Sequence, residues 1–580
     1  MPGDGHSMGV EACDLLVIGS GAGGLAAAVT AAFHGLKVIV VEKEPVFGGT
    51  TAWSGGWMWV PRNPLARRAG IVEDKETIRT YLRAEIGNHY DGGRIEAFLE
   101  AGPRMVDFFE RHTALHFING NRVPDMHGNL PGAGIGGRSV CAAPFDGRLM
   151  GPLAVKLRPP LREISFFGMG IASGADLGHF MNAARSLDSF IHAGKRFAKH
   201  LLDLARHGHG THLVNGNALA ARLGKSATDL GVEIRVGSPA RRLLRESGGI
   251  GGAVVATADG GEVTIRARRG VVLACGGFPH DVARKRDLFG HAPTGHEHWS
   301  AAPRTNTGDG LRLGEQAGGT VDTSLAAPGA WAPVSLVPRP DGSVGHFPHL
   351  VERAKPGFIA VNAKGRRFVN EADSYHDFVQ GMIQAAGPGE EVACWGICDH
   401  RFIRHYGLGF AKPAPLPLFP YLRSGYLKRA ATLEELAWVC GVDPTGLART
   451  VEEYNRHARI GEDPEFERGS TPYNKVQGDA RQLPNPCVAP VEQGPFYAVK
   501  MVPGSLGTFA GLKTDPSARV LDGMGEPIAG LYAVGTDAAS VMGGFYPAGG
   551  INLGPAMTFG YLAGRHAAGI AAYEDAADAA

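Results

Sequence analysis

Residues 15–24 read LLVIGSGAGG, and a second apolar run further along ends at the acid Glu42. An apolar strand that breaks into glycine, an Ala-rich helix, and a second strand followed by an acid are typical of a dinucleotide-binding βαβ unit. In such a unit Gly19 permits the tight turn, Gly21 lets the backbone approach the pyrophosphate, and Gly24 lets helix and strand pack closely. The pyrophosphate lies at the positive N-terminus of the helix, and Glu42 is placed to accept hydrogen bonds from a ribose.

The segment just beyond this unit favours FAD over NAD. Residues 48–56 read GGTTAWSGG. So much glycine carries an entropic cost, which close approach to a ligand would explain. A flavin whose pyrophosphate lies on the first helix would place its ring system near this segment. The alternative, a flexible loop, fits less well with a position directly after the dinucleotide unit.

Two further apolar strands end in glycine, far along the chain. Residues 270–278 read GVVLACGGF, and residues 530–537 read GLYAVGTD. After residues 543–550, GGFYPAGG, the Ala-, Leu- and Met-containing stretch 551–572 predicts a helix. The free N–H groups and partial positive charge of its N-terminus suit a reduced flavin or an enolate oxygen. The middle and the end of the chain are therefore both expected to return to the dinucleotide-binding domain.

Length, charge and cysteine content limit the class of protein. The 580 residues can bury one large two-domain core or three smaller ones. With 58 Lys and Arg against 57 Asp and Glu, the net charge of +1 indicates neither nucleic-acid binding nor electrostatic membrane attachment. The seven dispersed cysteines form no metal-ligand pattern and favour a reducing compartment. Residues 1–13 do not resemble a signal peptide, so a cytoplasmic location is expected.

The remaining patterns predict a lid and a second domain. Residues 75–111 and the amphipathic stretch 187–204 are predicted helices, and residues 115–150 are a predicted loop. Residues 151–210 are predicted to form a lid or partner-facing insertion, and exposure of its apolar side chains would indicate a peripheral membrane contact. Residues 325–505, richer in proline and aromatics, predict a substrate-bearing domain. Further predicted elements are helices over 215–230 and 308–318 and a strand over 232–236.

In its motifs the chain resembles the fumarate reductase-like flavoproteins, and within them the 3-ketosteroid Δ1-dehydrogenase branch. The resemblance covers nearly the whole chain and rests on the N-terminal fingerprint, residues 271–278, the run GRRFVNEADSYHDF at 365–378, and residues 543–554. It implies non-covalent FAD and oxidation of a carbon–carbon bond next to a ketone. The implied fold class is α/β, a Rossmann-like FAD-binding domain of the glutathione reductase type with an inserted α+β substrate domain.

The implied FAD-binding domain spans residues 10–324 with a lid-like insertion at about 112–210. A catalytic domain follows over 325–505, and residues 506–580 return to the FAD-binding domain. The residues expected to bind FAD, from the motifs and the resemblance together, are Gly19, Gly21, Ala22, Gly24, Glu42, Lys43, Gly49, Thr50, Thr51, Ser54, Gly55, Gly56, Ala240, Gly276, Asp309, Gly535, Asp537, Asn552 and Leu553.

Two departures separate the chain from the dicarboxylate enzymes of the same fold. Fumarate reductases and succinate dehydrogenases carry one arginine near the position of Tyr375 and another in the C-terminal glycine segment. Here residues 546–550 read YPAGG, without a cation. A site that lacks such a pair of cations cannot compensate two buried carboxylates. Residues 50–53 also lack the histidine that links flavin covalently in succinate dehydrogenases.

The resemblance implies catalytic roles for three residues. The Tyr546 hydroxyl and the Gly550 backbone N–H would hold the ketone oxygen, and each such donor contributes roughly 2.7–4 kcal/mol in known oxyanion holes. Tyr375 would take the α-proton while flavin N5 accepts hydride from the β-carbon. Because a phenol has a pKa near 10, holding it as phenolate at neutral pH costs roughly 4 kcal/mol. We therefore expect activity to rise with pH unless the surroundings lower that cost.

Several histidines need an interpretation. The family also uses an aromatic hydroxyl from the loop before the lid, but residues 123–132 contain no tyrosine, and His127 is the candidate replacement. His376 is a residue that supports the base, the base itself or, as is commoner, a surface histidine. A solvated turn, rather than a metal site, is predicted for His207, His209 and His212.

The leading interpretation is an FAD-dependent dehydrogenase that introduces a double bond α,β to a ring ketone, with a 3-ketosteroid as the favoured substrate. The same chemistry on a smaller cyclic ketone would tolerate the missing loop tyrosine. Reduction of an activated alkene is a second enzymatic alternative, and a flavin-binding electron-transfer subunit of a membrane complex is a third interpretation. The expected partners are a small hydrophobic ketone and an electron acceptor that no motif identifies.

Overall fold

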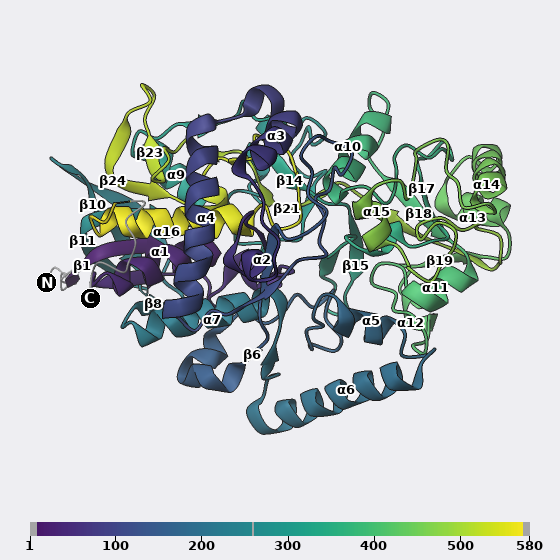
Figure 1. Cartoon of the computed structure of the whole chain (residues 1–580), viewed down its shortest axis with the longest axis horizontal. Coiled ribbons are helices and arrows are strands. Elements are labelled where there is room, and N and C mark those ends of the chain that lie inside the picture. Colours follow the sequence, from purple (N-terminus) through teal and green to yellow (C-terminus); the bar gives the residue numbers. More distant parts are fainter. Residues whose placement is uncertain (1–8, 258–259, 572–580) are drawn as a thin grey trace, which may run out of the picture.

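The structure, a computed structural model, describes residues 9–257 and 260–571. The described residues do not include 1–8, which belong to the N-terminal stretch that does not resemble a signal peptide, or 258–259. They also do not include 572–580, the last part of the predicted C-terminal return. Within the described part, helices and strands alternate along the chain and are arranged around two main sheets (Figure 1).

The larger sheet contains the first and the last strand of the described chain. Its neighbouring strands β24, β11, β1, β2 and β8 pair in parallel, as expected for the predicted βαβ unit and the returning segments. The second half of β1, Leu15–Ile18, and all of β2 are continuous apolar runs because both faces of this part of the sheet are covered. The strands are β1 (Gly9–Ile18), β2 (Val38–Val41), β8 (Glu233–Arg235), β9 (Ala240–Glu246), β10 (Gly249–Ala256), β11 (Glu262–Leu273), β23 (Arg519–Leu521) and β24 (Pro527–Ala533).

The first and last helices pack against each other on this sheet. Figure 1 shows α1 (Ala22–Phe33, purple) beside α16 (Leu553–Ala567, yellow). Their backbones approach so closely that a Cβ atom on Gly560 would lie 2.4 Å from the carbonyl oxygen of Gly23. The glycines and alanines of the two helices thus bring the C-terminal segment against the dinucleotide turn.

Helices elsewhere in this domain largely follow the sequence pattern, with one difference. The helix predicted over 75–111 is two helices, α3 (Lys75–Ile86) and α4 (Gly92–His112), because Gly87 takes a positive φ of 57° and Asp91 caps the next helix by accepting from the Arg94 N–H. The predicted helices over 215–230 and 308–318 are confirmed as α7 (Asn215–Asp229) and α9 (Asp309–Gln316). α16 ends at Ala567, earlier than expected, and α8 spans Val282–Leu288.

A second region of the structure lies at the other end of the molecule, to the right in Figure 1. Its four-stranded sheet, in the order β17-β18-β20-β19, has hydrophobic clusters on its two sides that are separate from those of the larger sheet. The boundaries of the substrate-bearing domain at residues 325 and 505 remain a prediction. The elements are β17 (Phe358–Val361), α10 (Tyr375–Ala385), β18 (Cys394–Cys398), α11 (His400–Tyr406), α12 (Phe419–Arg423), β19 (Lys428–Ala430), α13 (Leu433–Cys440), α14 (Pro444–Ala458), α15 (Pro472–Gln477) and β20 (Phe496–Met501).

Short strands join the two parts. A three-stranded sheet is formed by β12 (Trp299–Ser300), β21 (Gly504–Thr508) and β14 (Gly329–Trp331), and a hairpin by β15 (Val334–Pro338) and β16 (Val344–Pro348). The remaining short elements are α2 (Pro64–Arg68), β13 (Val321–Asp322) with β22 (Gly511–Leu512), and the 3₁₀ helices η1 (Gly49–Trp53), η3 (Gly147–Lys156), η4 (Glu352–Ala354) and η5 (Gly535–Asp537).

The region predicted as a loop over 115–150 contains strands. β5 (Ser139–Ala142) pairs with β3 (Trp57–Trp59) and with β4 (Phe117–Asn119), and β6 (Phe145–Asp146) pairs with β7 (His212–Leu213). These strands are short and flanked by Gly, Pro and Asn, so their own sequence does not predict them. They form because neighbouring segments are available as pairing partners.

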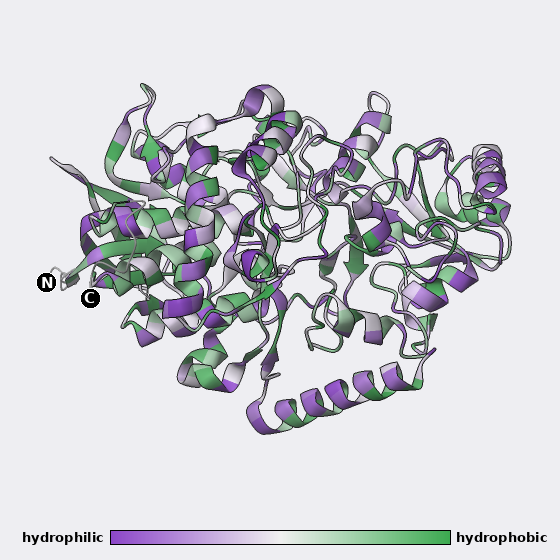
Figure 2. Cartoon of the chain, viewed as in Figure 1, coloured by the Kyte–Doolittle hydropathy of each residue, from purple (hydrophilic) through white to green (hydrophobic). Residues whose placement is uncertain are grey.

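The lid-like insertion ends in α5 (Ala175–Met181) and the long helix α6 (Leu187–His207), which confirms the predicted helix over 187–204. In Figure 1 this helix runs along the lower edge of the molecule, and in Figure 2 hydrophilic and hydrophobic residues alternate along it. Large apolar side chains of the insertion are exposed, among them Phe167 and Leu187.

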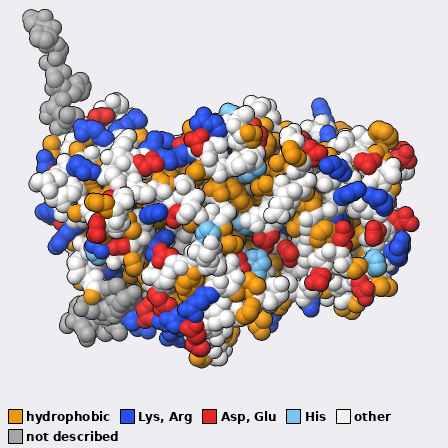
Figure 3. All heavy atoms as spheres, turned by 90° about the horizontal axis from the view of Figure 1, so that it is seen from above, with side chains coloured by type: hydrophobic (Ala, Val, Ile, Leu, Met, Phe, Trp, Pro, Cys, Tyr) orange, Lys and Arg blue, Asp and Glu red, His pale blue; other side chains and the backbone are white. Residues whose placement is uncertain are grey.

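Surface and cysteine chemistry agree with the composition. Figure 3 shows basic and acidic side chains interspersed over the face that it presents. All seven cysteines are free thiols. No helix in the described ranges has the length and apolar character needed to cross a bilayer.

Candidate functional site

A single cavity of about 1,380 Å³ extends from the glycine turn after β1 to the segment between β24 and α16. It is lined by the predicted catalytic residues Tyr375, Tyr546 and Gly550. It is also lined by all but one of the residues predicted to bind the cofactor: Gly19, Gly21, Ala22, Gly24, Glu42, Lys43, Gly49, Thr50, Thr51, Ser54, Gly55, Gly56, Ala240, Gly276, Asp309, Gly535, Asn552 and Leu553.

The three glycines of the first turn have different reasons to be glycine. Gly19 has a φ of +108°, and a Cβ atom there would lie 2.1 Å from the carbonyl oxygen of Ala274. A Cβ on Gly24 would lie 2.2 Å from the Gly19 carbonyl oxygen. By contrast, a Cβ on Gly21 would meet only Thr51 Oγ1, at 3.6 Å. Since Gly21 lines the cavity, the missing side chain leaves room for a ligand rather than for the protein itself, which fits a diphosphate at this turn.

The wall opposite this turn is built by η1 and hydroxyl groups. The Ala22 N–H, at the start of α1, donates to Thr51 Oγ1 over 2.9 Å, and the Gly48 N–H donates to Ser20 Oγ over 3.0 Å. Thr50 Oγ1 accepts from Asn306 Nδ2 over 3.1 Å. These bonds fix the glycine-rich segment against the positive end of α1.

The acid after β2 is held in place by its neighbours. One carboxylate oxygen of Glu42 accepts from the hydroxyl of Ser20 over 2.6 Å and from the backbone N–H of Ser20 over 3.2 Å. The other carboxylate oxygen accepts from the Glu44 N–H over 3.0 Å. Lys43 pairs with Asp309 at the start of α9. Glu42, Lys43 and Asp309 line the cavity wall, where the predicted ribose contacts would be made.

Asp537, predicted to bind the cofactor, does not line the cavity. Its fully buried carboxylate accepts from the N–H groups of Cys275, over 2.5 Å, and Gly277, over 2.9 Å. It therefore fixes the turn after β11 to the turn after β24, and its contact with the cofactor remains a prediction.

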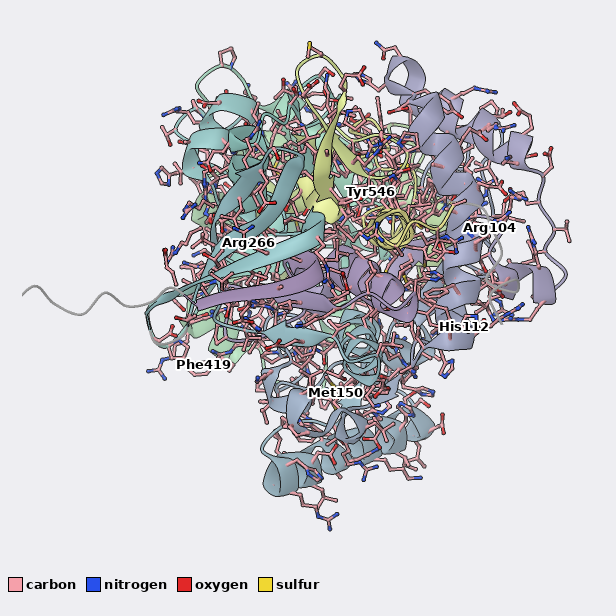
Figure 4. All side chains as sticks on the ribbon, turned by 90° about the vertical axis from the view of Figure 1, so that its left-hand side faces the viewer. Arg104, His112, Met150, Arg266, Phe419 and Tyr546 are labelled. Atoms are coloured by element: carbon pink, nitrogen blue, oxygen red, sulfur yellow. The ribbon has the colours of Figure 1, made fainter. Side chains whose placement is uncertain are left out.

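The two predicted catalytic tyrosines come from different parts of the chain. Tyr375 begins α10, which Ser374 caps, and Tyr546 lies in the glycine-rich loop before α16. Their ring centroids are 4.9 Å apart and their planes meet at 76°. In Figure 4 Tyr546 lies next to the yellow C-terminal segments, whereas Phe419 lies toward the lower left of the molecule.

The tyrosine hydroxyls are buried and protonated. Burial raises the pKa of Tyr546 to about 12, although hydrogen bonds from Tyr375 and Asn552 work in the opposite direction. Burial, together with the neighbouring phenols Tyr546 and Tyr473, raises the pKa of Tyr375 well above its ordinary value. Asn552 Nδ2 donates to the Tyr546 oxygen over 3.1 Å, which leaves the Tyr546 O–H free to act as a donor.

Gly550 adopts a φ of +102°, and a Cβ atom there would lie 2.7 Å from the Trp59 nitrogen. Its carbonyl accepts from the Trp59 N–H over 3.1 Å, while its own N–H has no hydrogen-bond partner among residues 9–257 and 260–571. The tight turn thus presents a backbone donor to the cavity a few residues from the Tyr546 hydroxyl.

His127, the candidate for the missing loop tyrosine, does not line the cavity. Its Nε2 lies 2.6 Å from Asp377 Oδ2 and its Nδ1 lies 2.8 Å from Glu85 Oε2. Burial alone would lower the pKa of this histidine, but the two carboxylates raise it to about 11. A permanently protonated, twice-paired imidazole connects the loop to α10 and is a poor proton acceptor.

His376 is buried, so the prediction of a surface histidine is wrong. Its Nδ1 accepts from the Trp331 N–H over 3.2 Å, and its Nε2 lies 3.1 Å from Gln380 Nε2. Burial lowers its pKa to about 4. With both ring nitrogens engaged and no surface on the cavity, His376 supports the position of α10 rather than acting as a base.

The sequence analysis missed Tyr473, which lines the same cavity from α15 and is only 4% exposed. Gly128 of the loop packs on the preceding Pro472, so α15 lies where that loop approaches the site. Burial raises the pKa of Tyr473. The buried guanidinium of Arg353 works in the opposite direction but does not outweigh burial. Only the Thr-Pro helix start marks this position in the sequence, and it carries no chemical signal.

His207 ends α6 and is exposed, whereas His209 in the following turn and His212 in β7 are half-buried. In the part of the chain that the structure describes, no group of three or more His, Cys, Asp or Glu side chains is arranged to hold a metal ion.

Comparison with known proteins gives consistent matches over the whole chain. A family model described as FAD binding domain matches residues 14–553. The 4-oxocyclohex-2-ene-1-carboxylate 5-dehydrogenase of Sinomonas cyclohexanicum is 42% identical over 97% of this chain and 94% of its own length. The 3-oxosteroid 1-dehydrogenase of Mycobacterium tuberculosis is 36% identical over 97% and 99%. The solved 3-ketosteroid Δ1-dehydrogenase of Sterolibacterium denitrificans, in complex with 1,4-androstadiene-3,17-dione, matches with a TM-score of 0.88 at 36% identity, over 96% of this chain and 100% of that one.

The open side of Gly21 leads to a prediction. Gly21→Ala should fold normally, because its Cβ has space, but should bind FAD at least about tenfold more weakly, a loss of roughly 1.4 kcal/mol. The measurement is FAD affinity of the deflavinated protein together with its thermal unfolding. Gly19→Ala is the contrasting variant, since its Cβ would strike the Ala274 carbonyl and destabilise the fold itself. Unchanged FAD affinity in Gly21→Ala would contradict a diphosphate at this turn.

Proposed function

The chain belongs to the 3-ketosteroid Δ1-dehydrogenase-like branch of the fumarate reductase and succinate dehydrogenase flavoproteins, and we propose that it desaturates a ring ketone, with a 3-ketosteroid as the leading substrate. It is an FAD-dependent oxidoreductase acting on CH–CH donors. The observation that carries the proposal is the convergence of Tyr375, Tyr546 and Gly550 on the cavity whose other end contains the dinucleotide turn.

The residues around the first turn fit FAD. The open side of Gly21, the N-terminus of α1 and the acid Glu42 offer room, positive polarity and ribose acceptors along one wall. When bound, FAD supplies the hydride acceptor for the oxidation. The other steps depend on side chains and backbone of this chain.

The proposed mechanism places the ketone oxygen between the Tyr546 O–H and the Gly550 N–H. Asn552 donates to the Tyr546 oxygen and so orients its proton away from Asn552. Two donors on the oxygen acidify the neighbouring α-carbon, and each contributes roughly 2.7–4 kcal/mol in comparable sites. Tyr375 accepts the α-proton as the C–H electron pair becomes the new C=C bond, and the β-carbon gives up its hydrogen as hydride.

Tyr473 is proposed to assist Tyr375 in place of the absent loop tyrosine. It lies on the cavity beside the two other phenols, and the guanidinium of Arg353 favours the ionised form of both Tyr473 and Tyr375. Arg353 is held by the backbone carbonyls of His349 and Glu371, so its position is fixed. A fixed buried cation near the phenols offsets part of the cost of ionising one of them.

A smaller ring ketone is the second candidate. The cavity is large and its lid wall carries aromatic side chains such as Phe166, Phe180 and Phe197, which suits a steroid skeleton. On the other hand, Met126 faces the cavity where the steroid enzymes of the family are expected to supply a loop hydroxyl. The 42% identical relative named for a cyclohexenone carboxylate supports the same alternative.

Anaerobic bleaching of the flavin tests the proposed function. Mixing the oxidised holoenzyme with 4-androstene-3,17-dione, or with 4-oxocyclohexanecarboxylate for the second candidate, should bleach the absorbance near 450 nm, while succinate should not. The matched product analysis must show one new C=C bond conjugated to the ketone. Bleaching by succinate but by neither ketone would refute the proposal.

The buried Tyr375 predicts a rise of activity with pH. Since its pKa is raised, only a small fraction is ionised at neutral pH, and that fraction grows about tenfold per pH unit below the pKa. The rate of flavin reduction at saturating ketone should climb between pH 6 and pH 10 without a plateau, as measured by stopped-flow absorbance. Tyr375→Phe should lower the rate at least about 100-fold. A flat wild-type profile with chemistry rate-limiting would count against Tyr375 as the base.

Tyr473→Phe is the companion variant in this experiment. It should keep the fold and substrate binding but slow flavin reduction at each pH, with a smaller effect than Tyr375→Phe. An unchanged rate and profile would remove Tyr473 from the mechanism while leaving Tyr375 in place.

A peripheral membrane contact through the lid is proposed as well. Phe167, Leu187 and Leu202 expose 69%, 76% and 55% of their surface, and Lys195 and Lys199 on α6 are exposed beside them. Apolar side chains flanked by lysines suit the surface of an anionic bilayer. This location would give a water-insoluble ketone a short route to the cavity.

Vesicle binding tests the membrane contact. Leu202→Asp should weaken binding to vesicles of phosphatidylcholine and phosphatidylglycerol about tenfold, because an apolar anchor becomes a charge. Val439→Asp is the matched control, since Val439 is 54% exposed but lies on α13. Co-sedimentation measures both, and equal loss in the two variants, or no wild-type binding, would argue against the contact.

A further inference from the structure

A half-buried lysine lies on the substrate cavity and takes no part in the chemistry proposed above. Lys412 follows the tight turn Leu408–Ala411 between α11 and α12, and its side chain lines the cavity that also contains the tyrosines. The rings of Phe347 and Phe410 flank its ammonium group, with their centroids 5.7 Å and 5.6 Å away.

The positive charge of Lys412 is poorly compensated. Within the described residues its ammonium group donates one hydrogen bond, over 3.3 Å to the backbone carbonyl of Glu163, and no carboxylate lies within ion-pair distance. The nearby acids point elsewhere: Glu163 Oε1 accepts from Arg339 while the buried Glu163 Oε2 has no partner among the described residues, and Glu352 pairs with His349. Burial lowers the pKa of Lys412 to about 8, although Glu352 and Glu163 work against that change. An ammonium in apolar surroundings is costly without a counter-ion.

The other cations of the cavity are accounted for within the described residues. Lys43 pairs with Asp309, and Arg158 pairs with Glu44. Lys355 donates to the carbonyls of Gln477 and Gly478 over 2.6 Å and 2.7 Å. Arg122 also lines the cavity but is exposed to solvent.

Residues of the 3₁₀ helix η4 act electrostatically on both Lys412 and the phenols. This short helix carries Arg353, whose charge acts on Tyr473 and Tyr375, and Glu352, whose charge acts on Lys412. Leu350 and Val351, just before it, line the cavity. Apolar side chains next to η4 therefore line the same cavity as Lys412 and Tyr546.

We propose that Lys412 binds a carboxylate on the substrate, remote from its ketone, so that the preferred substrate is a ring keto acid. The proposal rests on the proposed function and narrows its substrate class. A carboxylate at Lys412 forms a charge-assisted hydrogen bond inside the cavity and supplies the counter-ion that the protein lacks. The rest of the ligand, its ring or rings, contacts the apolar wall between the two polar ends.

Pairs of substrates that differ only in charge test the proposal. The holoenzyme is mixed anaerobically with 4-oxocyclohexanecarboxylate or its methyl ester, and with a 3-oxo steroid bearing a side-chain carboxylate or its methyl ester. For at least one pair the apparent Kd for flavin reduction should be at least about tenfold lower for the acid than for the ester. Equal constants in both pairs would overturn the proposal even if both ketones are oxidised.

Variants connect the preference to the lysine. Lys412→Met should weaken binding of the acid about tenfold or more and leave binding of the ester nearly unchanged. Lys412→Arg should retain part of the preference for the acid. Lys355→Met is the matched control, because that ammonium is taken by carbonyls, and its acid-to-ester ratio should stay at the wild-type value. If Lys412→Met weakens acid and ester equally, the lysine only holds the Glu163 carbonyl and the proposal fails.

A ligand without a ketone separates this proposal from the proposed function. Cyclohexanecarboxylate cannot be desaturated by the ketone mechanism, yet it should perturb the flavin spectrum of the wild type and not that of Lys412→Met. Binding of this acid without oxidation of any ring ketone would refute the proposed function alone. Oxidation of ketones with no acid preference would refute the carboxylate site alone.

Discussion

The close contact between α1 and α16 is the constraint on which the site depends. Gly560 and Gly564 meet the backbone of α1 so closely that a Cβ on either would lie within 2.7 Å of a carbonyl oxygen of that helix. This contact places the loop before α16, with Tyr546 and Gly550, beside the turn after β1. A cofactor cradle and a ketone-binding turn, more than 500 residues apart in the sequence, thereby share one cavity.

The polar groups around the tyrosines are divided between those that hold structure and those that face the cavity. His127 and His376 are fully engaged with Asp377, Glu85 and the backbone of β14, and both stabilise the start of α10. Tyr375, at the first position of that helix, is left to face the ligand. Histidine, the usual proton acceptor near neutral pH, is thus excluded from the chemistry by its partners rather than by its distance along the chain.

The cofactor half of the site could be predicted from the sequence, because its requirements are local. Gly19, Gly21 and Gly24 mark a backbone turn whose geometry follows from their spacing, and the same holds for the glycine of each returning strand. The break at Gly87 was missed, since a helical apolar pattern continues on both sides of it. Asp537 was assigned to the ligand because it follows such a strand, yet its carboxylate serves a neighbouring turn. Tyr473 and Lys412 could not be found, because only the tertiary arrangement brings their isolated positions to the cavity.

The placement of β24 and α16 has a consequence for synthesis of the protein. The strand β24 completes the parallel sheet beside β11, and α16 lines the cavity, but both are synthesised after the other described elements of this domain. Until then the nascent chain holds β1, β2 and β11 with an uncovered sheet edge and an open apolar groove. Such an edge invites association with other chains. We therefore expect the nascent chain to be most prone to association in the interval between synthesis of β11 and synthesis of β24 and α16.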